Sequence, residues 1–290
     1  MLNPEKVRHL VKTHYSDLFI NSILESVERH QGHLKIAKGL RNHLGENTKS
    51  RQFTILSPVS RFISFNNKIL VDLGCGTGSL TVACALRGAN TIGVDIDRKD
   101  CQIAKLRAKE DFVGAQFIVA DAKNLPFKRE TFDICMCVEV IEHVSKDKEG
   151  IIYEAFRITR QQGLIEIETP NKLYIRDDHD TGLYFLNCLP KRVANCYAKL
   201  MGRMLINGLN SYVTLFFLKK VLQNYNCKIL GDIVGYNFDQ IKEIKYKKLT
   251  GRILVNFCKI PGLCMFIRLV RYFFPSLQLT ILKKSDYSTT

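Results

Sequence analysis

Residues 69–78 read Ile-Leu-Val-Asp-Leu-Gly-Cys-Gly-Thr-Gly, and this stretch decides the fold that the sequence predicts. Its first half is a short apolar strand with a single charged residue. Its second half carries Gly74, Gly76 and Gly78, which allow a tight turn and a close approach of a ligand to the backbone. An amphipathic helix is expected directly afterwards, over residues 80–87. The stretch therefore predicts a strand, a ligand-binding turn and a helix in direct succession.

Strands and helices alternate regularly beyond this turn. The expected strands are 68–73, 90–95, 116–120, 132–138 and 163–169, with a later pair at 227–234 and 277–283. The expected helices are 80–87, 99–110, 148–160 and 215–224. Apolar strands separated by helices are typical of βαβ units in an α/β fold, whose parallel sheet is buried on both faces. Because such crossovers are right-handed, the carboxyl ends of the strands should meet at one edge of the sheet.

Helical regions are also expected on both sides of this core. Residues 5–44 place apolar side chains at helical spacing, and a short helix is expected near 58–65. We therefore predict an N-terminal helical extension over residues 1–65 and a main domain over 66–290. The main domain should contain a basic helical insertion at about 240–275, before the last strand.

The positive charge of the chain is concentrated in its last third. Residues 191–290 hold 17 Lys/Arg and 4 Asp/Glu, which account for +13 of the formal net charge of +15. A one-sided basic surface suits an anionic partner such as a membrane face, a nucleic acid or a phosphorylated substrate. Residues 262–274 also place apolar side chains on one face and arginines towards another, as an interfacial helix does. The alternatives are a solvated basic face, and a helix that covers the sheet edge with its apolar side in the core.

The spacing of the glycines separates two kinds of nucleotide site. Gly74, Gly76 and Gly78 give the pattern G-x-G-x-G. A dinucleotide fingerprint has G-x-G-x-x-G/A, and it would need glycine or alanine where Ser79 stands. An NAD-dependent dehydrogenase therefore fits the fold class but not this turn.

Carboxylates lie in or directly after the first three expected strands. Asp95 ends the second strand about twenty residues beyond the glycines, where a carboxylate can accept both hydroxyls of a ribose. Asp121 follows the third strand, and Asp72 lies in the first. Any one of them alone would suit a helix cap or a solvated turn. Together they predict one crevice at the carboxyl edge of the sheet.

These motifs resemble those of the class I S-adenosylmethionine-dependent methyltransferases, and within them the type 11 group that includes ubiquinone-biosynthesis methyltransferases. The matching stretches, in order, are VDLGCGTG, GVDID, VADAKNLPF, FDICMCVEVIEHV and GLIEIETPN. The resemblance is strong over residues 68–171 and weak elsewhere. It implies a Rossmann-like, seven-stranded, mostly parallel sheet flanked by helices, with the last strand antiparallel.

The same resemblance implies a binding site for S-adenosylmethionine. The residues that it assigns to the cofactor are Asp72, Gly74, Cys75, Gly76, Gly78, Asp95, Ile96, Asp121, Ala122 and Glu139. In this assignment Asp72 and the glycines surround the methionine portion and the sulfonium. Asp95 holds the ribose, Asp121 with Ala122 holds the adenine, and Glu139 flanks the cofactor in the loop after the fourth strand.

The chemistry that this cofactor implies needs few catalytic groups. A methyl group on a sulfonium is already activated, so the enzyme has to align a nucleophile in line with it and exclude water. A hydroxyl acceptor would also need a general base. One candidate is His143, at the start of the helix after strand four, which can also be a packing residue. The others are Asp177 and His179 in the acidic run 176–180, which we favour for acceptor binding or proton transfer over a divalent ion.

The acceptor stays open at this level. We expect a small-molecule, lipid or lipid-linked acceptor, resembling a quinone or glycan precursor, with an anionic membrane surface as a further partner. RNA methylation is the alternative suggested by the basic last third, although residues 137–140 carry neither the [DNS]PP[YFW] motif nor the Pro-Cys of nucleic-acid methylases. A non-catalytic partner subunit that kept the fold is the alternative from another class.

Composition suggests a reducing compartment. The chain has ten cysteines without a CxxC pair, and residues 1–12 lack an apolar signal segment. We expect free, mostly buried cysteines and no resident metal. No stretch is apolar over the roughly 20 residues that a bilayer-spanning helix needs. The expected location is the cytoplasm, with peripheral contact to a membrane.

Overall fold

The computed structural model of the protein describes residues 15–31, 44, 55–174, 183–202, 212–232 and 276–285. The α-helices are α2 (Asp17–Gln31), α5 (Ser79–Ala85), α6 (Arg98–Glu110), α7 (Lys148–Ile158), α8 (Lys191–Leu200) and α9 (Leu215–Leu222). The strands are β1 (Ile69–Leu73), β2 (Asn90–Asp95), β3 (Ala115–Val119), β4 (Phe132–Val138), β5 (Thr159–Pro170), β6 (Cys227–Asp232) and β7 (Ser276–Lys283). Two short 3-10 turns are η2 (Ile141–His143) and η3 (Leu186–Cys188).

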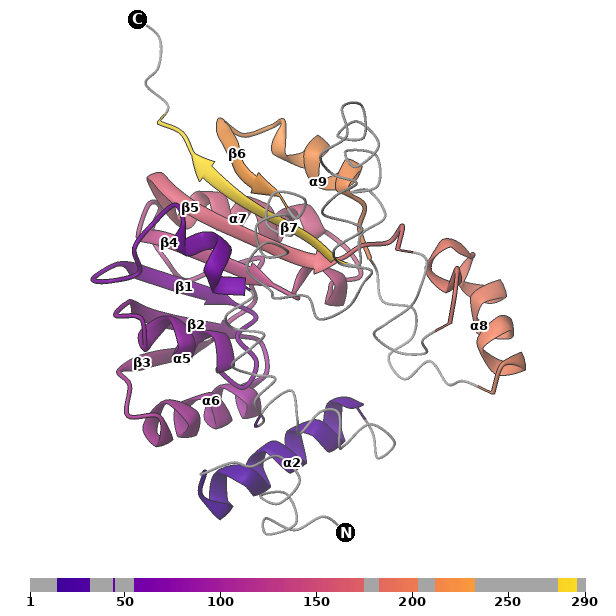
Figure 1. Ribbon diagram of the computed structural model, residues 1–290, viewed down its shortest axis with the longest axis horizontal. Helices are drawn as coiled ribbons and strands as arrows, with labels where there is room; N and C mark the ends of the chain where they lie inside the picture. The colour runs from indigo at the N-terminus through magenta and orange to yellow at the C-terminus, as the bar shows by residue number, and fades with distance from the viewer. Residues whose placement is uncertain are drawn as a thin grey trace, which may run out of the picture. The chain divides into compact units, whose positions relative to one another are not determined.

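The strands form one seven-stranded sheet in the order β3-β2-β1-β4-β5-β7-β6 (Figure 1). It is mostly parallel, its last strands run antiparallel, and helices flank it, as the sequence predicted. The central strand β1 pairs in parallel with β2 and β4, and β2 pairs in parallel with β3. Leu73 is registered with Val94 and with Cys137, and Asp95 with Val119, so these four strands end at the same edge.

The strand predictions are confirmed within one or two residues except at the start of β5. Helix α7 ends at Ile158 rather than Arg160, and β5 begins at Thr159 rather than Gly163. Thr159 is buried and β-branched, and its hydroxyl donates to the carbonyl of Ala155, which closes the helix. Arg160 then pairs with Asp133 of β4 at 2.8 Å, which holds it in the strand.

The segment after β4 also differs from the prediction. His143 ends the short turn η2 instead of beginning a long helix. Helix α7 starts five residues later, at Lys148, where the Asp147 side chain accepts a hydrogen bond from the N–H of Gly150. A side-chain acceptor directly before a helix satisfies one of the N–H groups of its first turn, which have no partner within the helix. The cap at Asp147 therefore explains why α7 begins at Lys148 and not at His143.

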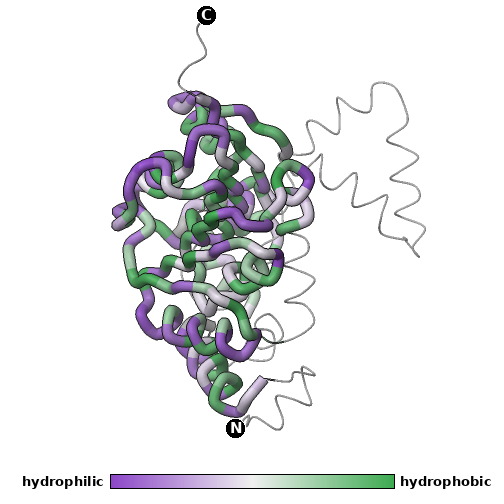
Figure 2. The backbone as a smooth tube through the Cα atoms, turned by 90° about the vertical axis from the view of Figure 1, so that its left-hand side faces the viewer, coloured by the Kyte–Doolittle hydropathy of each residue, from purple (hydrophilic) through white to green (hydrophobic). Residues whose placement is uncertain are grey.

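The expected N-terminal helices are described in part. Helix α2 confirms a helix within 5–44, and residues 55–60 are helical rather than 58–65. Apolar side chains of α2 form a buried cluster with α6, consisting of Phe19, Ile20, Ile23, Leu24, Val27 and Ile103, together with Leu44. Figure 2 shows hydrophobic and hydrophilic residues alternating along the chain, as expected when each helix buries one face.

The chain divides into two compact units. The first consists of residues 1–138, 147–166 and 283–290, and the second of 139–146 and 167–282. The predicted boundary near residue 65 stays a prediction, and the predicted basic insertion at 240–275 lies outside the described residues. Within the described ranges, none of the helices has the length and apolar character needed to cross a bilayer.

The described cysteines are free thiols. They are Cys75, Cys84, Cys101, Cys135, Cys137, Cys196 and Cys227, and the first five are buried. Burial raises the pKa of the Cys84 and Cys135 thiols, so these side chains stay protonated and pack as small apolar groups.

Candidate functional site

The glycine-rich turn connects β1 to α5 by alternating left-handed residues. Gly74, Gly76 and Gly78 have φ of +65°, +49° and +79°. Glycine reaches this region without steric cost, which is why the pattern needs glycine at every second position. The turn is held by hydrogen bonds from the N–H of Cys75 to the carbonyl of Val94, and from the N–H of Gly78 to the carbonyl of Cys75, both at 2.9 Å. The predicted glycine-rich turn between the first strand and the following helix is therefore present.

Two of these glycines face different surroundings. A Cβ on Gly78 would lie 2.7 Å from the Cβ of Ala104 in α6, so this glycine permits close packing of the turn on the helix. Among the residues that the structure describes, a Cβ on Gly76 would meet no atom within 4 Å. The backbone at Gly76 therefore borders open space, as a turn that cradles a ligand requires.

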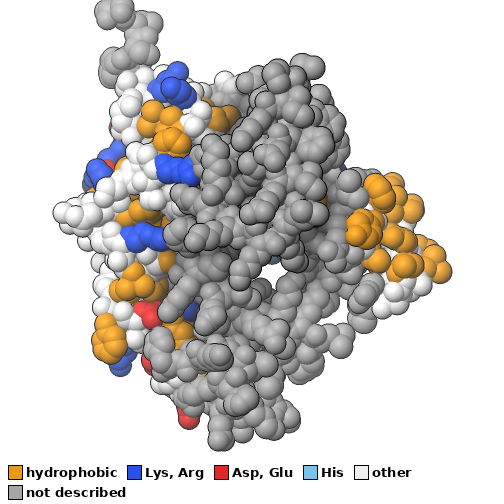
Figure 3. Space-filling model, in the orientation of Figure 1, with side chains coloured by type: hydrophobic (Ala, Val, Ile, Leu, Met, Phe, Trp, Pro, Cys, Tyr) orange, Lys and Arg blue, Asp and Glu red, His pale blue; other side chains and the backbone are white. Residues whose placement is uncertain are grey.

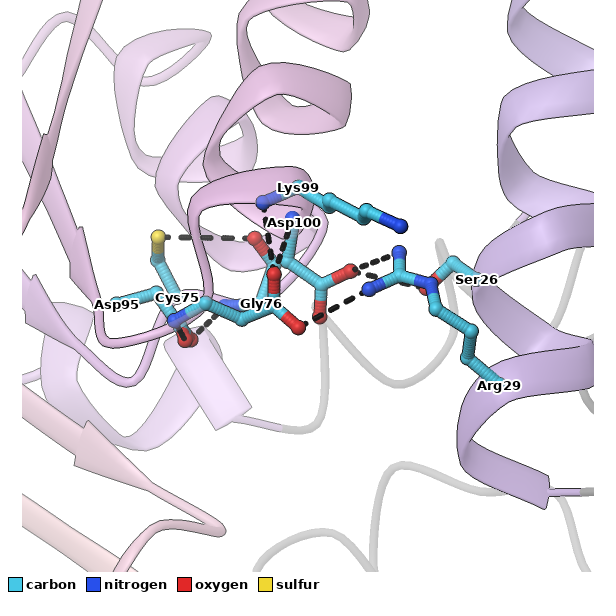
Figure 4. A network of polar contacts seen from close by, with 8 residues as sticks. Ser26, Arg29, Cys75, Gly76, Asp95, Lys99 and Asp100 are labelled. Carbon is cyan, nitrogen blue, oxygen red and sulfur yellow. Dashed lines mark hydrogen bonds and ion pairs between the residues drawn. The ribbon is translucent and has the colours of Figure 1, made fainter.

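Asp95 ends β2 beside this open position. Its Oδ2 accepts a hydrogen bond from the N–H of Gly76 at 2.7 Å, and its Oδ1 accepts one from the N–H of Asp97 at 2.9 Å (Figure 4). Each carboxylate oxygen has a second lone pair, so both oxygens can still accept from a ribose hydroxyl. The side chain is half-buried, and it fits the role that the sequence predicts for it.

The neighbouring strand end presents the residues predicted for the adenine. The N–H of Ala120 donates to the carbonyl of Asp95 at 3.0 Å, which brings the segment after β3 beside the end of β2. Asp121 keeps 43% of its side chain exposed, and its Oδ1 accepts from the N–H of Lys123 at 2.9 Å. Ala122 is half-buried, and Ile96 is 71% exposed. The exposed Ile96 directly follows Asp95 and offers an apolar surface on which a flat ring can pack.

Asp72 is placed differently from the other two carboxylates. It is only 2% exposed, and its Oδ2 accepts a hydrogen bond from the hydroxyl of Thr81 in α5 at 2.6 Å. Burial raises the pKa of Asp72 to about 7, the charge of Asp95 adds to the rise, and the Thr81 hydrogen bond opposes it. Asp72 thus ties β1 to the helix that leaves the turn, and Thr81 is a member of the site that the sequence analysis did not identify.

The remaining described candidates belong to the second compact unit. Glu139 directly follows β4 with φ of +56°, and its N–H donates to the carbonyl of Glu168 at 2.8 Å. Glu142 is buried and accepts a hydrogen bond from the hydroxyl of Thr169 at 3.1 Å. His143 is exposed, so it is not a core packing residue. Asp177 and His179 lie outside the described residues.

Comparison with known proteins relates the chain to methyltransferases. Residues 71–167 match the family described as a methyltransferase domain. A ubiquinone biosynthesis O-methyltransferase from Bartonella quintana (strain Toulouse) is 30% identical over 175 residues, which are 58% of this chain and 68% of that protein. The protein of the same name from Pelagibacter ubique (strain HTCC1062) is 33% identical over 103 residues, which are 36% of this chain and 42% of that protein.

The aligned region covers only part of the length of these relatives. Apart from the 68% of the Bartonella quintana protein, it spans less than half the length of the first curated relatives, for example 42%, 47% and 41%. The family match at residues 71–167 contains the glycine turn and the strands β2, β3 and β4.

Solved structures share the fold. An S-adenosylmethionine-dependent methyltransferase from Mesorhizobium loti aligns with a TM-score of 0.52 and 15% identity, over 79% of this chain and 96% of that chain. A magnesium protoporphyrin IX methyltransferase from Synechocystis PCC 6803, solved with bound SAH, aligns with a TM-score of 0.51 and 15% identity, over 82% and 83%. At 15% identity, these two structures show that the chain shares their fold.

Proposed function

We propose that the chain methylates a small-molecule acceptor. It belongs to the class I S-adenosylmethionine-dependent methyltransferases, and within them to the type 11 group that includes ubiquinone-biosynthesis methyltransferases. The acceptor class that we favour is a lipid or lipid-linked precursor, resembling that of a quinone or a glycan. The observation that carries the proposal is the pairing of Asp95 with the open turn at Gly76.

The residues at this edge fit the cofactor of the family. S-adenosylmethionine, when bound, supplies a methyl group on a positively charged sulfur, which an acceptor nucleophile can take by in-line displacement. Gly74, Cys75, Gly76 and Gly78 would present backbone to its methionine portion, and Asp72, whose pKa of about 7 leaves it partly ionised at neutral pH, would lie behind them. Asp95 would accept from the ribose hydroxyls, and Ile96, Asp121 and Ala122 would border the adenine. Glu139 would flank the cofactor from the loop after β4.

The contribution of the chain to the reaction is alignment and proton transfer. The turn and Asp95 are held by hydrogen bonds within the chain itself, so a ligand need not supply the contacts that order them. If the acceptor is a hydroxyl, a base has to take its proton as the oxygen becomes methylated. The exposed His143 is one candidate for this base, and Asp177 and His179 are the others.

A membrane surface fits as a partner because of the surface around α8. The buried side of this helix carries Ala194 and Ala198, which pack with Leu183 and Leu186. The exposed large apolar residues of η3, α8 and their flanks are Tyr184, Phe185, Val193, Leu200 and Met201, and we call them the α8 surface (Figure 3). Arg192 and Lys199 are exposed on the same helix, which has no acidic residue. Apolar side chains beside cations suit the interface of an anionic membrane.

Labelled methyl transfer tests the function. We would incubate the protein with methyl-labelled S-adenosylmethionine and a cell extract, and then separate lipid, small-molecule, nucleic-acid and protein fractions. Label in the lipid or small-molecule fraction is the expected result. Label confined to nucleic acid would replace the proposal with RNA methylation. No label in any fraction, together with no calorimetric binding of the cofactor, would establish the non-catalytic alternative.

A further inference from the structure

Arg107 places a buried positive charge behind the glycine turn. It lies on α6 and is 2% exposed, and its Nε donates a hydrogen bond to the carbonyl of Thr77 at 2.8 Å. Thr77 is the residue between Gly76 and Gly78, both of which have positive φ. A charge is costly to bury unless its contacts compensate, so this arrangement needs further partners.

Helix α2 and Tyr15, two residues before it, supply those partners. The guanidinium carbon of Arg107 lies 5.0 Å from the ring centroid of Phe19 and 5.9 Å from that of Tyr15. Cations within about 6 Å of an aromatic centroid are attracted by the ring face. The hydroxyl of Tyr15 donates to Asp111 at 3.1 Å, just beyond the end of α6. The aromatic end of α2 is thus connected to the turn through one arginine.

A second connection runs from the other end of α2. Arg29 donates to Asp97 at 3.0 Å and to Asp100 at 3.2 Å, and the hydroxyl of Ser26 donates to Asp100 at 3.0 Å (Figure 4). Asp97 is the cap of α6, and its own N–H donates to Asp95. The Asp95 carboxylate in turn accepts from Gly76. Figure 4 shows these groups as one network from α2 to the turn.

The two connections end on the groups that form the candidate cofactor site. One fixes a carbonyl of the turn, and the other fixes the loop that orients Asp95. Neither Arg107 nor Arg29 belongs to the set that we propose to touch the ligand. Their contacts restrict the turn before binding, and such preorganisation raises affinity because less conformational freedom is lost on binding.

We propose that α2 is a positioning element for the methyl donor and that Arg107 is its main positioning residue. The identity of the ligand rests on the proposed function, whereas the coupling between α2 and the turn rests on the contacts above. Coupling between two parts of a protein is reciprocal. If α2 strengthens ligand binding at the turn, the bound ligand must stabilise α2 on α6 by the same factor.

Calorimetric titration with S-adenosylhomocysteine tests the first half of this proposal. Arg107→Met keeps the apolar stem but leaves the Thr77 carbonyl without its charged donor, and we expect about tenfold weaker binding or more. Arg107→Lys keeps a charge that can reach the carbonyl, and should recover part of the affinity. Arg29→Gln removes partly exposed ion pairs and should weaken binding about threefold. Lys105→Met, on the exposed side of α6, is the matched control and should leave affinity unchanged.

Hydrogen exchange tests the reciprocal half. Saturating S-adenosylhomocysteine should slow exchange in peptides from residues 17–31 of the wild-type protein, and this protection should be reduced in Arg107→Met. A purely structural arginine would lower stability without changing the protection that the ligand adds. Circular dichroism of each variant without ligand checks that the variant is folded. If Arg107→Met does not fold, the affinity of Arg29→Gln and the hydrogen exchange of the wild-type protein decide whether α2 has the positioning role.

The outcomes separate the two proposals. No binding of S-adenosylhomocysteine by the wild-type protein would overturn the proposed function. Normal wild-type binding with equal affinity in folded Arg107→Met and Arg29→Gln would overturn the positioning role and leave the function intact. Wild-type binding without added protection of α2 would also overturn it, because it would show that α2 and the turn are not coupled.

Discussion

The Oδ2 atom of Asp95 lies 2.7 Å from the backbone nitrogen of Gly76, so the carboxylate that ends β2 closes the turn that follows β1. One side chain therefore shapes the turn and remains available to a ligand. This dual role makes Asp95 the position at which the cofactor assignment is tested most directly.

Replacing Asp95 with alanine should weaken the binding of S-adenosylmethionine by about 1.5–3 kcal/mol, which is the range for hydrogen bonds to a charged group. The loss has two sources, the ribose contacts and the freed N–H of Gly76. Calorimetry measures it, with Glu149→Ala on the exposed start of α7 as the control. Unchanged affinity in Asp95→Ala would remove the ribose assignment.

Alanine at Gly76 and at Gly78 should have different effects. Gly78→Ala would place its Cβ 2.7 Å from that of Ala104, and we expect severe destabilisation in urea unfolding. Gly76→Ala has open space and only the cost of a left-handed alanine, about 1–2 kcal/mol. Its Cβ would occupy the space that we assign to the ligand, so cofactor affinity should fall although the protein folds. A folded Gly76→Ala variant with wild-type affinity would place the ligand elsewhere.

Asp72 should make stability depend on pH. Its pKa is raised from 3.8 to about 7 in the folded protein, so between these values the folded state binds a proton that the unfolded state has lost. The contribution of this group to the free energy of unfolding therefore falls as pH rises from about 4 to about 7, and it is constant above that. Urea unfolding at pH 5 and pH 8 should show a smaller difference in Asp72→Asn than in the wild type. Equal differences in both proteins would contradict the assignment.

Arg157 should hold the segment that follows Asp121. It pairs with Glu154 and donates to the carbonyls of Phe127 and Leu125, while Glu154 accepts from the N–H of Leu125 at 2.7 Å. Arg157→Met leaves a largely buried carboxylate without its partner, and we expect a loss of about 3–5 kcal/mol in the free energy of unfolding. Lys128→Met, which changes an exposed cation on the same segment, is the control. A loss no larger than that of the control would contradict this role.

The α8 surface should bind anionic membranes. Co-sedimentation with vesicles of phosphatidylcholine and phosphatidylglycerol should exceed that with phosphatidylcholine alone. Leu200→Asp should reduce it, because a charge replaces an apolar contact with the interface. Phe112→Asp changes an equally exposed apolar residue on a different segment and should have no effect. Negligible binding to both kinds of vesicle would reject the membrane partner.

The sheet and the glycine turn were predictable because their signals are local. Apolar strands alternate with helices along the chain, and the turn needs glycine at three fixed positions. The boundary between α7 and β5 was not predictable, since Arg160 joins the strand through Asp133, a residue 27 positions earlier. Whether residues at this boundary join the helix or the strand therefore depends on a contact with a residue that is distant in the sequence.

The contacts that hold the glycine turn from behind could not be predicted from the sequence either, because they join residues that lie far apart along the chain. Arg107 is a helix residue in a run of charged residues, and its burial depends on Phe19 of α2 and on Tyr15, two residues before that helix. Asp95 and Asp121 were found because they stand at strand ends, which the alternation of elements locates. The roles of Asp177 and His179 stay predictions, and so does the identity of the general base.

The pairing of α2 with α6 has a consequence for how the chain is made. Tyr15 meets Asp111, a residue 96 positions further on, and Ser16 meets Glu110. During synthesis from the N-terminus, Phe19, Ile20 and Ile23 therefore leave the ribosome long before the helix that covers them exists. Chain segments with exposed apolar surface are prone to aggregate and are the targets of chaperones. The interval between the synthesis of the two helices is thus a stage at which the nascent chain needs such protection.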